Sequence, residues 1–113
     1  MKYTIIITKS ATADMDKTFQ YISEKLKNSI AAARLITESK KAINSLSDMP
    51  YRIPLVRDDY LAEYGIRMIQ IKKHLAFFVI AENTKTIYIL RFLYSRRNWI
   101  KILKTDIKEG NFS

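Results

Sequence analysis

The chain has 113 residues, of which 48% are hydrophobic, with two glycines, two prolines and no cysteine. This length fits a single domain over residues 1–113, and the scarcity of glycine and proline argues against a disordered or low-complexity segment. His74 is the one histidine. Disulfide frameworks, cysteine zinc sites and two-histidine metal sites are therefore excluded, and we predict no cofactor and no metal.

Positive charge is concentrated in the second half of the chain. The net charge is +9, and residues 51–104 alone carry eleven basic and four acidic residues. Such a surface attracts polyanions, which favours nucleic acid, a ribosome or an acidic protein as partner, although a generally lysine-rich proteome gives the same excess. The run LAFFVIA is far shorter than the about 20 residues that span a bilayer, and the N-terminal apolar stretch is too short for a signal peptide. We expect a cytoplasmic protein without membrane contact.

The first half of the sequence predicts a strand followed by two helices. Three successive isoleucines in residues 3–8 indicate a strand that is buried on both faces, as an inner strand is. After Ser10 or Thr12 as a cap, apolar residues recur at helical spacing as far as residue 26. A second such series runs from residue 32 to residue 46. Two antiparallel helices in a hairpin are the simplest result.

The second half predicts three more strands and a short final helix. The segments IRMIQIKK, LAFFVIAE and TIYILRFLY are separated by the turn-like KKH and ENTK, so neighbouring strands are expected to be antiparallel. Residues 96–103 are expected to form a helix that docks through Trp99. The predicted fold is α+β: a helical hairpin covers one face of a twisted, antiparallel four-stranded sheet and leaves the other face partly open.

Two arginines lie within apolar strands. Strict alternation places Arg67 on one side of its strand with Ile69, and Arg91 on one side of the last strand with Ile87 and Ile89. A charge in such a place needs either a partner or a function. For Arg67 the structural alternative is an ion pair with a carboxylate such as Glu63 or Glu82.

Three segments together resemble the RelE/ParE superfamily of toxins from bacterial type II toxin–antitoxin systems. They are SATADMDKTFQYI, PYRIPLVRDDYLAEYGIRMIQIKKHLAFFVI and ILRFLYSRRNWIKIL. The resemblance implies a RelE-like fold and a growth-arresting toxin that a cognate antitoxin wraps around and neutralises in a hetero-oligomer. One branch of the superfamily enters the ribosome and cuts messenger RNA, and the other poisons DNA gyrase without being a nuclease.

Metal-free RNA cleavage needs a general base, cations that stabilise the charged phosphorane and an acid for the leaving oxygen. Arginine suits the second role because its guanidinium pairs two phosphate oxygens. The resemblance matches Arg67 to the arginine of the family's G-x-R motif. The predicted catalytic residues are Arg67, Arg91, Tyr94, Lys73 and His74. The predicted RNA- or phosphate-binding residues are Arg52, Lys72, Arg96 and Arg97.

Each member of this set has a structural alternative. Tyr94 is either a proton donor or stacking ring, or a strand-end packing residue, and Trp99 is expected to serve packing. His74 is a candidate base, with a pKa lowered by the neighbouring lysines, or a surface turn residue. The histidine that some nuclease relatives carry before the final tyrosine is replaced here by Leu93.

The sequence therefore predicts a ribosome-dependent mRNA endoribonuclease, with the ribosome, mRNA and an antitoxin as partners. The first alternative is an inhibitor of DNA gyrase that has no nuclease activity. The second is a degenerate toxin that binds only its antitoxin.

Overall fold

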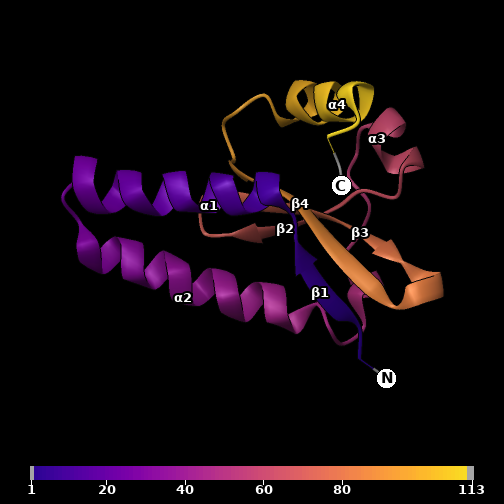
Figure 1. Ribbon diagram of the computed structural model, residues 1–113, viewed down its shortest axis with the longest axis horizontal. Helices are drawn as coiled ribbons and strands as arrows, with labels where there is room; N and C mark the ends of the chain where they lie inside the picture. The colour runs from indigo at the N-terminus through magenta and orange to yellow at the C-terminus, as the bar shows by residue number, and fades with distance from the viewer. Residues whose placement is uncertain (1, 112–113) are drawn as a thin grey trace.

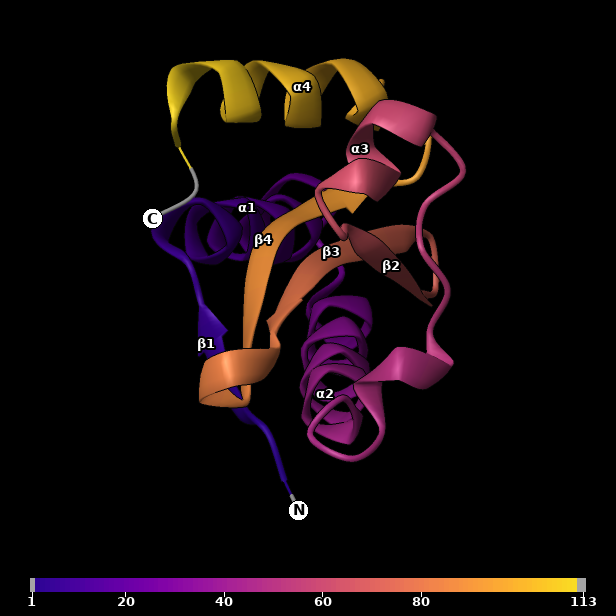
Figure 2. The same ribbon diagram turned by 90° about the vertical axis from the view of Figure 1, so that its right-hand side faces the viewer.

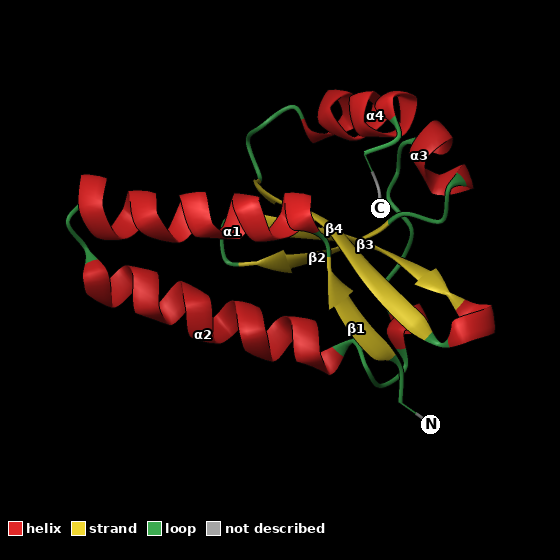
Figure 3. Ribbon diagram, viewed as in Figure 1, coloured by secondary structure: helices red, strands yellow, loops and turns green. Residues whose placement is uncertain are grey.

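A computed structural model describes residues 2–111 and shows an α+β fold, as predicted (Figures 1 and 3). The elements are, in chain order, β1 (Thr4–Ile7), α1 (Lys9–Gln20), a π-helical turn (Tyr21–Lys25), α2 (Ser29–Ser45), α3 (Asp59–Glu63), β2 (Arg67–Ile71), β3 (His74–Ala81), β4 (Thr86–Tyr94) and α4 (Trp99–Glu109), with 3₁₀ turns at Pro50–Arg52 and Glu82–Thr84. The order of strands and helices agrees with the sequence, and α3 is an addition to it.

The predicted helical hairpin is present, and side-chain caps define where each helix begins. The side chain of Thr8 accepts a hydrogen bond from the backbone N–H of Ala11, so α1 begins directly after β1. The cap is Thr8, two residues before the predicted Ser10. Thr8 has the extended backbone conformation that an N-cap adopts. The Asn28 side chain caps α2 by accepting from the N–H of Ala31. Figure 1 shows α1 and α2 side by side, extending beyond the sheet.

The sheet has the order β1-β4-β3-β2 and is mixed rather than wholly antiparallel. β2, β3 and β4 are antiparallel neighbours, as predicted, whereas β1 lies parallel to β4 at the edge. The expectation of an inner strand was wrong, because only one side of β1 is paired. Ile6 and Ile7 are 43% and 41% exposed. Three successive isoleucines thus mark an edge strand here, and hydrophobicity alone did not distinguish it from an inner one.

Each face of the sheet carries a core cluster, and the face that was expected to be partly open is covered in part by α3 and α4 (Figure 2). One core cluster joins the sheet to α1 and α2 through Ala11, Leu35 and Ile43. The other joins it to α3 and α4 through Leu61 and Leu103. α4 is longer than the predicted helix because its buried stripe continues past residue 103, and Asn98 caps it. Among residues 2–111, no helix combines the length and apolarity needed to cross a membrane.

Candidate functional site

Arg91 is held between two helices by two carboxylates. Its Nε and Nη2 atoms donate to the carboxylate of Asp14 in α1, at 2.7 and 2.9 Å. Its Nη1 donates to Asp106 in α4 at 3.0 Å. The side chain of Arg91 is 16% exposed, and those of Asp14 and Asp106 are 13% and 8% exposed. These carboxylates, Asp14 first, raise the pKa of Arg91 above its ordinary value. We call these three residues the Arg91 triad.

A β-bulge in β4 determines the side of the strand on which Arg91 lies. Phe77 pairs with Arg91 but Phe78 pairs with Ile89, so Leu90 is an extra residue in β4. The bulge reverses the alternation beyond it: Ile89 and Phe92 both pack against the α1–α2 side, while Leu90 packs on the α3–α4 side. The prediction that Arg91 shares a side with Ile89 was therefore wrong.

Asp14 also completes the sheet where β1 ends. β1 pairs with β4 only as far as Ile89, and beyond it the N–H of Phe92 donates to a carboxylate oxygen of Asp14 at 3.0 Å. The same carboxylate thus satisfies a strand-edge N–H and the guanidinium of Arg91. An unpaired backbone donor in a partly buried place is costly, so this contact stabilises the junction of α1 and β4.

Arg67 lies elsewhere, in β2, on the other side of β3 from β4. It shares a side of β2 with Ile69, and its Nη1 donates to the backbone carbonyl of Ile53. Its guanidinium lies over the ring of Tyr51, 5.1 Å from the centroid. The two arginines therefore contact different elements, and no carboxylate within residues 2–111 forms an ion pair with Arg67.

Glu82, one suggested partner of Arg67, is bound by other groups. The hydroxyls of Tyr3 and Tyr51 both donate to its Oε1 at 2.8 Å, and Lys85 pairs with its other oxygen. These donors, Lys85 first, lower the pKa of Glu82 to about 2. The resulting surface cluster connects the start of β1 and the 3₁₀ turn at Pro50–Arg52 to the β3–β4 turn. Arg67 contacts this cluster through the ring of Tyr51.

His74 and Tyr94 lie together at the end of the β3–β4 ladder that is opposite to Glu82. They pair directly across β3 and β4, with ring centroids 5.6 Å apart. The imidazole stacks on Phe92 at 5.2 Å, and its Nδ1 is buried without a hydrogen-bond partner. Burial lowers the pKa of His74 below its ordinary value. The pKa of His74 is lowered, as predicted, but the cause is burial in a strand rather than lysine neighbours in a turn.

The other predicted residues are spread over the surface. Lys72 and Lys73 form the β2–β3 turn, where Lys72 adopts a left-handed conformation with φ of 54°. Arg52 donates to Ser45 at the end of α2, at 3.0 Å to its hydroxyl. Arg96 and Arg97 are exposed between β4 and α4. Lys73, His74, Tyr94 and the two last arginines thus lie near one end of the β3–β4 ladder, whereas Arg52 does not.

Sequence reasoning missed both carboxylates of the Arg91 triad. A usable signal existed in α4, where Asp106 follows Leu103 by three residues and so falls on the buried stripe of the helix. A buried aspartate and an arginine inside an apolar strand each need a partner. Trp99 does serve packing, with its ring 5.2 Å from that of Phe77.

The position of His74 makes stability depend on pH. Because its folded-state pKa lies below the ordinary 6.5, the unfolded chain binds a proton more readily. The stabilisation from neutral His74 is therefore complete above about pH 6.5 and is lost as the pH falls towards the folded-state pKa. Unfolding in urea between pH 5 and 8 should show this fall, and His74→Gln should reduce it. An equal pH slope in both proteins would contradict the assignment.

Comparison with known proteins now supplies the family. Residues 5–99 match the family described as the ParE toxin of the type II toxin–antitoxin system parDE. The chain belongs to this family, within the RelE/ParE superfamily of toxins. No curated protein sequence matches it.

Two solved structures show the same fold. The chromosomal ParDE toxin–antitoxin system from P. aeruginosa aligns with 19% identity and a TM-score of 0.66, over 82% of this chain and 96% of that one. The toxin–antitoxin complex RelBE2 from Mycobacterium tuberculosis aligns with 20% identity and a TM-score of 0.57, over 83% and 99%. This ParE-family chain thus shares its fold with toxin–antitoxin systems of the ParDE and RelBE names.

Proposed function

We propose that this ParE-family toxin arrests growth by binding and inhibiting DNA gyrase, without cleaving RNA. The observation that carries the proposal is the Arg91 triad. All three guanidinium nitrogens of Arg91 donate to Asp14 or Asp106, so this arginine has no free fork for a phosphate. Releasing it would leave the buried carboxylate of Asp106 and the half-buried one of Asp14 without their partner.

The separation of the arginines supports the same proposal. A nuclease site needs several cations directed at the position where the phosphorane charge develops. Arg67 and Arg91 are directed at different elements, one at Ile53 and Tyr51 and the other at α1 and α4. Binding to a protein target needs no such convergence.

A cognate antitoxin is the second proposed partner. Both structural relatives are toxin–antitoxin systems, and the net charge of +9 suits an acidic antitoxin segment. Exposed apolar side chains gather at the end of the helical hairpin, where Tyr21, Leu26 and Ile30 are 55%, 56% and 68% exposed. We place the antitoxin contact on this hairpin, because exposed apolar groups of this kind favour a protein partner.

A supercoiling assay tests the gyrase proposal. Purified toxin is expected to inhibit the conversion of relaxed plasmid to supercoiled plasmid by gyrase, and the antitoxin should relieve the inhibition. The same preparation should leave message on translating ribosomes intact. Cut message together with unaffected supercoiling would overturn the proposal.

The endoribonuclease remains a second candidate because of the pair formed by His74 and Tyr94. The sheet places a neutral imidazole beside a phenol, with Lys73 next to it in the chain, although Leu93 occupies the histidine position of some nuclease relatives. Such a group could work as base and acid on RNA bound in the ribosome. If it does, His74→Gln and Tyr94→Phe would each abolish message cleavage, whereas gyrase inhibition would survive both changes.

A further inference from the structure

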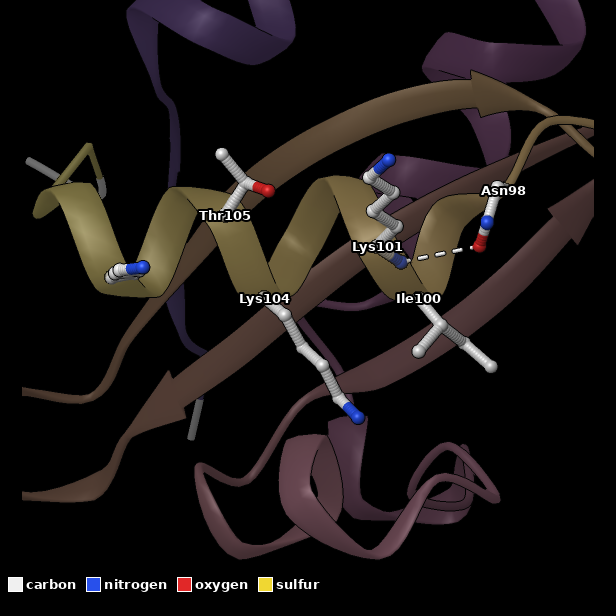
Figure 4. Close-up of a pocket in the computed structure, with 6 residues that line it drawn as sticks. Asn98, Ile100, Lys101, Lys104 and Thr105 are labelled. Carbon is white, nitrogen blue, oxygen red and sulfur yellow. Dashed lines mark hydrogen bonds between the residues drawn. The ribbon is translucent and has the colours of Figure 1, made fainter.

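The outer side of α4 carries a row of lysines. Lys101, Lys104 and Lys108 are all exposed and follow one another at helical spacing, on the side opposite to the buried Leu103 and Asp106. We call these three residues the α4 lysine face. Figure 4 shows Lys104 extending towards α3 and Lys101 extending the other way, so that their ammonium groups are spread over the outer surface of the helix.

Two shallow hollows flank this face, and no carboxylate lines either of them. The first is lined by the three lysines with Asn98, Ile100 and Thr105. The second is lined by Tyr60, Tyr64, Ile107, Lys104 and Lys108. Lys104 lies 3.5 Å from Asp58, while Lys101 and Lys108 form no ion pair with any residue in the described part of the chain. At least two of the three charges are therefore available to a ligand.

The residue types and their spacing fit a nucleic acid backbone. Lysine, threonine and asparagine side chains are typical donors to phosphate oxygens. Lys101 and Lys108 are about 10.5 Å apart along the helix axis, from a rise of about 1.5 Å per residue. Each base-pair step of a duplex rises by about 3.4 Å, so the face spans about three steps of a duplex that lies parallel to α4.

Other polyanions fit this surface less well. A single strand is held by free aromatic faces, but the rings of Tyr60 and Tyr64 lie against each other at 5.4 Å and Lys104 lies over Tyr60 at 5.4 Å. The cores of protein interfaces are depleted in lysine, whereas lysines occupy the centre of this surface.

We propose that the α4 lysine face binds the backbone of duplex DNA without sequence specificity. This activity goes beyond the proposed inhibition of gyrase and is measurable without that enzyme, so either proposal can fail while the other stands. If the toxin binds gyrase while gyrase holds DNA, the α4 lysine face would contact the DNA while another part of the toxin contacts gyrase.

Fluorescence anisotropy with a labelled 20-base-pair duplex tests the proposal over a range of salt concentrations. The variant Lys101→Gln with Lys104→Gln and Lys108→Gln is compared with a control in which Lys17, Lys40 and Lys41, exposed on α1 and α2, are changed to glutamine. Both variants have a net charge of +6 instead of +9. Thermal unfolding checks that both remain folded, and a third variant with arginine at the three α4 positions restores the charge.

The α4 glutamine variant should lose at least tenfold in affinity at low salt. Its log–log salt slope should be shallower by up to about 2.7, since each phosphate contact contributes about 0.9. The control variant should lose much less, and the arginine variant should bind like the parent chain. Equal losses in the two glutamine variants would overturn the proposal, as would tighter binding to a single strand of the same sequence or to polyglutamate.

Discussion

Replacement of Arg91 by alanine is expected to lower the free energy of unfolding by about 3–5 kcal/mol, because it leaves the buried carboxylate of Asp106 and the half-buried one of Asp14 without a counter-charge. The triad is mostly shielded from solvent, with side-chain exposures between 8% and 16%, so water screens the loss only partly. Urea unfolding at neutral pH measures the change.

The matched control for this substitution is Arg96→Ala, which removes the same side chain from an exposed turn. Its effect should stay within about 0.5 kcal/mol. Asp14→Asn should be milder than Arg91→Ala, because an asparagine oxygen can still accept from the N–H of Phe92. Similar small losses for Arg91→Ala and Arg96→Ala would contradict a structural role for the triad.

Phe92→Ala is expected to cost about 3–5 kcal/mol of stability. Phe92 is 1% exposed and connects two parts of the fold, since its ring packs edge-on against Phe19 of α1 at 5.9 Å and stacks on His74 at 5.2 Å. The substitution leaves a cavity between α1 and the sheet and opens the imidazole of His74 to water. The pKa of His74 should then rise towards its ordinary value.

The two readouts of Phe92→Ala are independent. Urea unfolding gives the stability, and NMR titration of the one histidine in the chain gives its pKa. Leu26→Ala is the control, because Leu26 is 56% exposed and its loss should change neither quantity appreciably. A Phe92→Ala protein with parent-like stability would contradict the packing seen here.

Periodicity was sufficient to predict the order of the strands and of the longer helices, although not α3. Helical spacing in residues 9–45 and alternation in β2 and β3 report burial directly, so the hairpin and the antiparallel strands followed from local pattern. The edge position of β1 did not, because an isoleucine run is compatible with both kinds of strand. Pairing partners far apart in the chain, such as Thr4 and Thr86, leave no local mark.

The candidate site was harder to predict because one inserted residue decides it. Leu90 interrupts the alternation of β4 and turns Arg91 away from the side that holds Ile89. A bulge has no signature in this stretch, since Leu90 is an ordinary strand residue rather than a glycine. The partners Asp14 and Asp106 come from helices 77 and 15 residues away in the chain. Charge and residue type identified Arg91 as unusual, but only the fold shows what it binds.

The role that we propose for Arg91 is to support the fold without taking part in chemistry. A triple variant tests it most directly: Arg91→Met with Asp106→Leu removes the charges, and Asp14→Asn keeps an acceptor for the N–H of Phe92. Replacing a buried ion network with apolar side chains of similar volume often leaves a protein folded, with stability equal or higher. Gyrase inhibition and growth arrest by this variant, checked for folding by circular dichroism, are the quantities to measure. A structural role predicts that both match the parent chain, whereas a folded variant that has lost both would contradict it.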